Sequence, residues 1–365
     1  GLPVGDLLCC HRRTEKIETY LLVNRTKLPQ QCLFGCAAEG RIEEWSLETG
    51  ERGPIATTPR PGGGLQVSLE FEPAEARLLV VTPGDPLEDI AELPEPTILE
   101  HIELNTQWDF EAQGGNVMIL DRWEVTLRDI PVSNRLHVPE KINTYRAKFT
   151  VSGKPGKVRL VLDDVEQWIP SHVGFLSGLR SLEIFVNGQQ APTLSRCEWQ
   201  DPDYLWTDIT YLLREGENEI EIDTISLLNP MHSLREPVYL VGEFTLKQGV
   251  MASPERKVRG RHTQQGYPHL AGLARYRQLV IIPERFTSER LILDPGEVEG
   301  CMRVIVNGHT VATRIWPPYE VDITRAAHGG SNEIIIEIAG TLGNLYSKET
   351  RPFGLKGRAV IWVMS

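Results

Sequence analysis

Long apolar runs are absent from this sequence, since no stretch approaches the roughly 20 apolar residues that a helix needs to span a bilayer. Basic residues are also few: 38 Lys and Arg stand against 50 Asp and Glu, and they form no dense stripe. The net charge of −12 argues against a nucleic-acid groove or an anionic membrane surface. We therefore expect neither nucleic acid nor membrane as a partner.

Cysteine pairs with metal-binding or redox spacing are missing as well. The chain has six cysteines, but none forms a C-x-x-C motif and none has a histidine at a zinc-like spacing. Cys32 and Cys36 would lie about 13 Å apart in an extended strand, too far for a disulfide. We expect buried, chemically silent thiols, and they do not settle the cellular compartment.

Helical periodicity is nearly absent, and short runs of β-branched and aromatic residues take its place. Turns rich in Gly, Pro, Asn and Asp separate these runs, which explains the 32 Gly and 25 Pro. Typical runs are Glu18–Asn24, Leu65–Phe71, Val158–Leu162 and Asn332–Ile338. The chain is predicted to be all-β.

The length of 365 residues predicts two or three domains. We expect a β-sandwich over 1–83 and a linker over 84–98, because that stretch is rich in Pro and acidic residues. Two further β domains are expected over 99–247 and 248–365. The chain opens GLPVGDLL, with neither an initiator Met nor a signal-peptide pattern, so we expect a processed or excerpted piece of a longer chain.

The last two β regions contain the same five blocks in the same order. The pairs are Tyr145-Arg-Ala-Lys-Phe149 with Tyr276-Arg-Gln-Leu-Val280, Arg159–Asp163 with Arg290–Asp294, Val186-Asn-Gly188 with Val306-Asn-Gly308, Asp208-Ile-Thr210 with Asp322-Ile-Thr324, and Gly216–Ile220 with Gly330–Ile334. Their offset drifts from 131 to 114, as expected when loops change length while strands are kept. The chain therefore carries two copies of one sandwich.

Each block has a structural interpretation. Val-Asn-Gly after an alternating strand predicts a tight hairpin, because Asn and Gly tolerate positive φ. Asp-Ile-Thr before an apolar pair predicts a capped helical turn, and the Asn-Glu-Ile that follows restarts a strand. This order of strand, hairpin and turn is typical of a jelly roll.

These blocks resemble the sugar-binding-domain sandwich of glycoside hydrolase family 2 and of large rhamnosidase-like enzymes. The resemblance in the second copy is carried by Val306-Asn-Gly308, Trp316-Pro-Pro-Tyr319, Asp322-Ile-Thr324, Gly330-Ser-Asn332 and Thr341-Leu-Gly-Asn344, and between the copies by Gly266–Gly272. The first domain is similar to the all-β domain that often follows a catalytic barrel, through His11-Arg12, Tyr20–Asn24 and Trp45–Gly50.

The resemblance implies one immunoglobulin-like or similar sandwich followed by two galactose-binding-like jelly rolls. It also implies a non-catalytic C-terminal region whose catalytic residues stand on an upstream (α/β)₈ barrel, which no strand–helix alternation here could build. The expected function is carbohydrate binding or bracing of the catalytic domain. The expected partners are an oligo- or polysaccharide and that upstream domain. A pure scaffold without ligand and a glycosidase with its own site are the alternatives. A secreted or periplasmic location is favoured over a cytoplasmic one.

Sugars are bound by aromatic rings that stack on their faces and by polar groups that bind their hydroxyls. The candidate carbohydrate-binding residues are Trp168, Trp199, Asp203, Tyr204, Trp206, Tyr267, His269 and Trp316. Trp168 lies in a loop that the second copy lacks, and the Trp199–Tyr204 stretch lies in a loop longer by six residues. We therefore expect Trp168, Trp199 and Tyr204 to be at least partly exposed.

Each candidate also has a structural alternative. Trp206 could instead pack under the sandwich, and Trp316 could close one end of it as a structural residue. Tyr267 and His269 could pack in a seam between domains. We expect no cofactor, although Asp201 and Asp203 leave calcium open. The tryptophans within regular strands are expected in the core, namely Trp45, Trp108, Trp123 and Trp362.

Overall fold

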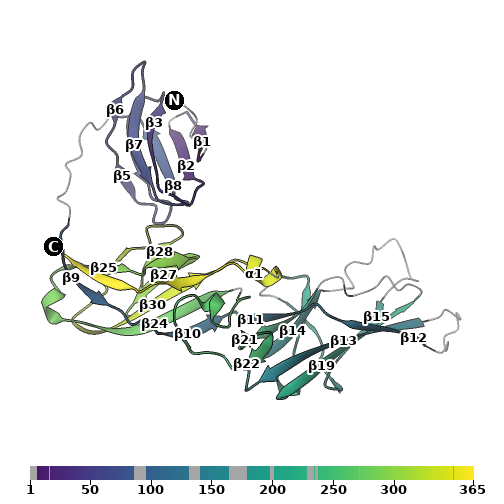
Figure 1. Ribbon diagram of the computed structural model, residues 1–365. Coiled ribbons are helices and arrows are strands. Elements are labelled where there is room, and N and C mark those ends of the chain that lie inside the picture. The colour runs from purple at the N-terminus through teal and green to yellow at the C-terminus, as the bar shows by residue number, and fades with distance from the viewer. Residues whose placement is uncertain are drawn as a thin grey trace. The chain divides into compact units, whose positions relative to one another are not determined.

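The computed structural model describes residues 6–15, 17–85, 96–130, 140–163, 179–197, 201–227, 234, 237–270, 272–347 and 349–365. Over these residues nearly all regular structure is antiparallel strand, which confirms the predicted all-β, multi-domain β-sandwich (Figure 1). In the described part of the chain, no helix is both long and apolar enough to cross a membrane.

The chain divides into two compact units. One comprises 1–106, 277–338 and 355–365, and the other comprises 107–276 and 339–354. The domain boundaries expected from the sequence stay a prediction, and residues 86–95 of the expected linker lie outside the described residues.

Residues 6–85, within the first unit, form two facing sheets. The first sheet has the order β1 (Leu7–Arg13), β2 (Glu18–Asn24), β8 (Ala76–Thr82), β4 (Arg41–Trp45) and β5 (Arg52–Pro54). The second has the order β3 (Gln30–Cys36), β7 (Leu65–Phe71) and β6 (Thr58–Pro59). Strand β7 shows why they pack: its alternate residues Leu65, Val67, Leu69 and Phe71 are buried, and those between them are more exposed.

The rest of the first unit holds the second copy of the repeat. One sheet has the order β29 (Val321–Asp322), β25 (Arg290–Asp294), β32 (Val360–Met364) and β9 (Ile98–Glu103). A second sheet contains, in this order, β24 (Leu273–Ile282), whose residues from Arg277 on belong to this unit, β30 (Gly330–Ala339), β27 (Cys301–Val306) and β28 (His309–Arg314). Short elements complete it, namely η5 (Glu284–Phe286), β26 (Glu297–Glu299) and β31 (Gly354–Lys356).

The second unit holds the first copy. One sheet has the order β11 (Asn116–Leu120), β20 (Val238–Gly242), β14 (Val158–Asp163), β18 (Tyr204–Asp208) and β17 (Ser195–Arg196). The facing sheet has the order β16 (Gln189–Gln190), β15 (Leu179–Val186), β19 (Gly216–Leu227), β13 (Glu140–Ser152), β22 (Val250–Ala252) and β21 (Thr245–Lys247), with β12 (Glu124–Ile130) beside β13. The other elements are β10 (Trp108–Gln113), β23 (Lys257–Val258), η3 (Thr210–Leu212), η4 (His262–Gln264) and α1 (Gly343–Tyr346).

Both Asn-Gly pairs form the predicted hairpin turns. Asn187 and Gly188 have φ of 52° and 76°, and Asn307 and Gly308 have φ of 51° and 82°. Two consecutive residues with positive φ characterise the two-residue turn that fits twisted antiparallel strands. The flanking pairs are Val186 with Gln189 and Val306 with His309, so this prediction is confirmed in both copies.

Each hairpin is fixed to the strand that follows by the same side-chain hydrogen bonds. Asn187 Nδ2 donates to Asn218 Oδ1 at 2.8 Å, and Glu219 N donates back to Asn187 Oδ1 at 3.1 Å. In the second copy Asn307 Nδ2 donates to Asn332 Oδ1 at 2.8 Å, and Glu333 N donates to Asn307 Oδ1 at 2.9 Å. The Asn-Glu-Ile block therefore positions the hairpin as well as starting a strand.

The two Asp-Ile-Thr blocks also share one arrangement. Asp208 Oδ1 accepts hydrogen bonds from Thr210 N and Oγ1 at 3.0 and 2.6 Å, and Asp322 Oδ1 does the same with Thr324 at 3.1 and 2.6 Å. The expected helical turn is a 3₁₀ turn, Thr210–Leu212, in the first copy. In the second it is a turn in which Ala326 N and Ala327 N donate to Ile323 O.

Strand β14 and its counterpart β25 align differently from the sequence expectation. Thr210 Oγ1 accepts from Val158 N, whereas Thr324 Oγ1 accepts from Leu291 N, both at 2.9 Å. Val158 is thus equivalent to Leu291, an offset of 133 rather than 131. Arg159 consequently matches Ile292, and Lys157 matches Arg290.

The expected core positions are only partly correct. Trp108 is buried, but Trp45, Trp123 and Trp362 are half-buried. Each of these three donates its indole N–H, to Glu43, the Leu120 carbonyl and Asp294 respectively, so each ring keeps a polar edge outside the core. The cysteines were expected to be buried, yet Cys9, Cys10 and Cys301 are exposed and Cys32 is half-buried.

Candidate functional site

One face of the sheet that contains β14 gathers side chains from several strands of the second unit. Val158, Leu160 and Leu162 enter the sandwich core, so Arg159 and Val161 between them point to the opposite face. On that face Val161 lies between Tyr239 of β20 and Trp206 of β18. Val161 belongs to an apolar cluster on this face, whose buried members are Val117, Val161, Cys197, Tyr204, Tyr239, Val241 and Leu345.

A cavity of about 420 Å³ lies beside Arg159 on this face. The apolar part of its lining is Val117, Val241, Leu342 and Leu345, and the charged part is Glu111, Lys157, Arg159 and Glu243. Gly242 lets β20 approach β14 here, because a Cβ at this residue would lie 2.1 Å from the Lys157 carbonyl oxygen. The volume falls within the roughly 300–1,000 Å³ of small-ligand sites.

The charges around this cavity are partly neutralised by neighbours. Glu111 Oε2 lies 3.4 Å from Arg275 Nη1, and Asp208 Oδ2 lies 3.8 Å from Lys157 Nζ. Burial raises the pKa of Asp208, but hydrogen bonds from Thr210 and the charges of Lys157 and Arg159 outweigh burial and lower this pKa overall. Asp208 is therefore ionised at neutral pH and holds Lys157 near the cavity.

Two of the sequence candidates lie beside this site. Trp206 is half-buried, its Nε1 donates to the Arg196 carbonyl at 3.1 Å, and the Arg159 guanidinium lies 5.0 Å from its ring centroid. Tyr204 is only 7% exposed and packs against Tyr239, so the expectation that its ring is exposed is wrong. The reason is that Tyr204 begins β18 and pairs with Asp163, which directs it onto the apolar cluster.

Three further candidates make hydrogen-bond contacts within the second unit. Asp203 is exposed, and its N–H donates to Asp201 Oδ1 at 2.9 Å. Tyr267 is buried and donates its hydroxyl to the Glu255 carbonyl at 2.7 Å, and burial raises its pKa to about 12. His269 Nδ1 lies 2.7 Å from the Asn344 carbonyl oxygen. Tyr267 and His269 thus contact loop backbone within the second unit, and the seam between domains, their structural alternative, stays a prediction.

Trp316, among the described residues, is not brought to this site. Trp316 is half-buried in the loop before β29 of the first unit, next to the cis Pro317–Pro318 bond. Trp168 and Trp199 lie outside the described residues, so their expected exposure stays a prediction.

Sequence reasoning missed Lys157 and Arg159. Arg159 stands in β14 and Lys157 directly precedes it, two positions away and next to a strand whose other face is apolar, which is also the pattern of an ordinary solvent-facing strand. Comparison of the two copies by sequence did not reveal them, because it pairs Arg159 with Arg290. Only the observed register places the buried Ile292 at the position equivalent to Arg159.

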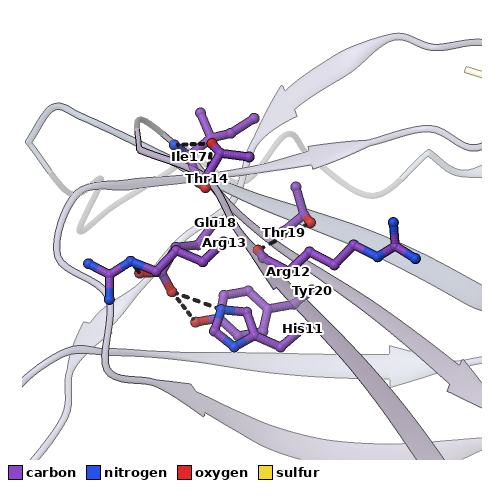
Figure 2. A network of polar contacts seen from close by, with 8 residues as sticks. All are labelled: His11, Arg12, Arg13, Thr14, Ile17, Glu18, Thr19 and Tyr20. Atoms are coloured by element: carbon purple, nitrogen blue, oxygen red, sulfur yellow. Dashed lines mark hydrogen bonds and ion pairs between the residues drawn. The ribbon is translucent and has the colours of Figure 1, made fainter.

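A second polar cluster joins β1 to β2 in the first unit (Figure 2). Glu18 Oε2 accepts from the Tyr20 hydroxyl at 2.7 Å and lies 3.0 Å from His11 Nε2, and Glu18 Oε1 lies 3.2 Å from Arg13 Nε. The His11 and Tyr20 rings stack at 4.3 Å. A cavity of about 520 Å³ adjoins these residues. Because Glu18 is engaged by three neighbouring side chains, we assign the cluster to holding β1 in place.

No family model and no curated protein matches the chain. Among solved structures, a rhamnosidase from Novosphingobium sp. PP1Y is 17% identical, covering 99% of this chain and 24% of that chain with a TM-score of 0.41. An α-L-rhamnosidase from Streptomyces avermitilis complexed with L-rhamnose is 10% identical, covering 97% and 38% with a TM-score of 0.28. A β-porphyranase of glycoside hydrolase family 86 from Bacteroides plebeius is 11% identical, covering 66% and 37% with a TM-score of 0.16. The solved structures similar to this chain thus include glycoside hydrolases at low identity, and the chain spans about a quarter of the first.

Proposed function

We propose that this chain is an accessory, non-catalytic region of a glycoside hydrolase and that it binds carbohydrate in the cavity beside Arg159. The repeated Val-Asn-Gly, Asp-Ile-Thr and Gly-x-Asn blocks support the first half of this proposal, because they resemble sugar-binding-domain sandwiches. In the parent chain its partner is an upstream catalytic domain, and the location is secreted or periplasmic.

The composition of the cavity lining supports the proposal that the cavity binds carbohydrate. Sugars present C–H faces and hydroxyl groups together, so their sites combine apolar contact with hydrogen-bonding side chains. Here Val117, Val241 and Leu342 supply apolar contact. Lys157 and Arg159 supply donors, and Glu243 supplies acceptors, within one cavity of about 420 Å³.

An exposed leucine at the rim allows a direct test. Leu342 lines the cavity and is 49% exposed, so Leu342→Ala removes contact with a ligand while leaving the fold intact. We expect calorimetric titration with a panel of neutral and acidic plant oligosaccharides to show binding, weakened about fivefold by this substitution through lost apolar contact. Leu279→Ala, at a residue of β24 that is 68% exposed and outside the cavity lining, is the matched control.

A scaffold without ligand is the second candidate function. The observation that favours it is that Tyr267 and His269 are used to hold backbone groups. Absence of binding heat from every oligosaccharide would favour the scaffold and contradict carbohydrate binding. Glycoside turnover by the purified chain, abolished by one Asp or Glu substitution, would instead contradict the accessory role.

A further inference from the structure

The two copies of the repeat allow one position to be compared within the same molecule. Val158 and Leu291 are equivalent because both donate to the threonine of their Asp-Ile-Thr block at 2.9 Å. The next residue, Arg159, is therefore equivalent to Ile292, which is 7% exposed. The first copy has a guanidinium where the second has a buried hydrocarbon side chain.

The neighbouring positions show which side chains both copies share, here called the repeated frame, and which side chain only the first copy has. Lys157 corresponds to Arg290, and each faces the aspartate of its block, at 3.8 Å from Asp208 and 2.8 Å from Asp322. A cation at this place therefore belongs to the repeated frame. Arg159 has no cationic counterpart in the second copy, so the repeated frame does not require it.

The guanidinium of Arg159 is held where a ligand in the cavity would meet it. It lines the cavity and lies 5.0 Å from the ring centroid of Trp206, whose own counterpart in the second copy is Glu320. Cation–π contact and half-burial restrict the side chain before any ligand arrives. A restricted guanidinium loses less freedom when it binds a planar, two-oxygen anion.

We propose that Arg159 determines specificity and binds the carboxylate of a uronic acid residue, with Lys157 as the second cation. This inference rests on the proposed carbohydrate binding and names its ligand class. Of the two carboxylates in the lining, Glu111 is engaged by Arg275, which leaves Glu243 as the main charge opposed to an acidic ligand. Glu243 thus limits affinity for uronates.

The test uses variants whose expected effects have opposite signs. Arg159→Ile installs the residue of the second copy and should keep the fold, because the frame accommodates isoleucine at this position. We expect it to weaken binding of trigalacturonate about ten- to a hundredfold, the size of a charge-assisted hydrogen bond, in isothermal titration of the full chain. We expect Glu243→Gln to strengthen binding about two- to fivefold through removal of one repulsive charge. Lys148→Gln, at an exposed residue of β13 outside the cavity lining, controls for net charge.

Ligand variation separates this inference from the function on which it rests. Trigalacturonate methyl ester should bind more weakly than the acid, and a sulfated galactose oligosaccharide should bind more weakly than trigalacturonate. Equal affinity of acid and ester, or of wild type and Arg159→Ile, overturns the role of Arg159 but leaves carbohydrate binding standing. Tighter binding of the sulfated sugar overturns the carboxylate assignment. No binding of any sugar overturns both proposals.

Discussion

Asn307 and Asn332 are joined by a hydrogen bond of 2.8 Å from the amide of the first to Oδ1 of the second. Asn332 is fully buried, accepts a second hydrogen bond from His328 N, and donates to the carbonyls of His328 and Gly330. One buried amide thus links the hairpin, the turn and the start of β30.

Replacing this amide should destabilise the fold strongly. Asn332→Ala leaves several buried polar groups without partners, and we expect a loss of about 2–4 kcal/mol in the free energy of unfolding. Urea denaturation followed by circular dichroism measures it. Ser331→Ala, at the exposed neighbour, should change stability by less than about 0.5 kcal/mol. Equal midpoints for the two variants would show that the network does not support the sandwich.

The hairpin glycine gives a second prediction. Gly308 has a φ of 82°, and a Cβ there would meet no atom within 4 Å, so a larger residue is opposed by backbone strain and not by a clash. Gly308→Val should cost about 1 kcal/mol or more, whereas Gly308→Asn should cost less because Asn tolerates positive φ. Thermal unfolding of both variants checks the order, and a valine variant as stable as the asparagine variant contradicts it.

Buried His262 predicts a dependence of stability on pH. Burial lowers its pKa to about 4, whereas an unfolded histidine has a pKa of about 6.5. The unfolded chain therefore takes up a proton first as pH falls, and stability declines from about pH 6.5 through pH 4, by about 3 kcal/mol in total. Above pH 6.5 the histidine adds no such dependence.

Denaturant titrations at several pH values test this dependence. In His262→Gln the decline between pH 6.5 and 4 should be shallower, although the variant is less stable at pH 7. His309→Gln, at an exposed residue, should keep the wild-type slope. Parallel slopes for wild type and His262→Gln would mean that other groups cause the pH dependence.

Glu18 should control the exposure of β1 to solvent. Glu18→Gln removes the charge that faces His11 and Arg13, so we expect faster amide hydrogen exchange in Leu7–Arg13 with little change in β7. Hydrogen bonding from Tyr20 lowers the pKa of Glu18 despite burial, so this protection is lost as pH falls through the lowered pKa. Glu15→Gln, at an exposed residue on the same hairpin, should leave exchange unchanged.

The hairpins were predictable from sequence because the Asn-Gly pair encodes its own backbone geometry. The register of β14 was not, since a slip of two residues keeps every side chain on the same face. The likeness of Arg159–Asp163 to Arg290–Asp294 favoured one register, and the hydrogen bonds of Thr210 and Thr324 select the other.

The candidate site was less accessible to prediction. Tyr204 stands in a lengthened loop, which favoured exposure, but pairing with β14 turns its ring onto Tyr239. The importance of Arg159 depends on its contact with Trp206, 47 residues later, and no local pattern encodes such a contact.

The hydrogen bonds of Asn187 and Asn307 also allow the loop length to change while the strand register is kept. Asn187 and Asn307 bind strands β19 and β30, so each hairpin is tied to a part of the chain that lies beyond its Asp-Ile-Thr block. Asp208 follows Val186 by 22 positions, whereas Asp322 follows Val306 by 16 positions. These loops are accordingly suitable grafting points, where a transplanted segment of different length would bring a new recognition surface onto an unchanged β-sandwich.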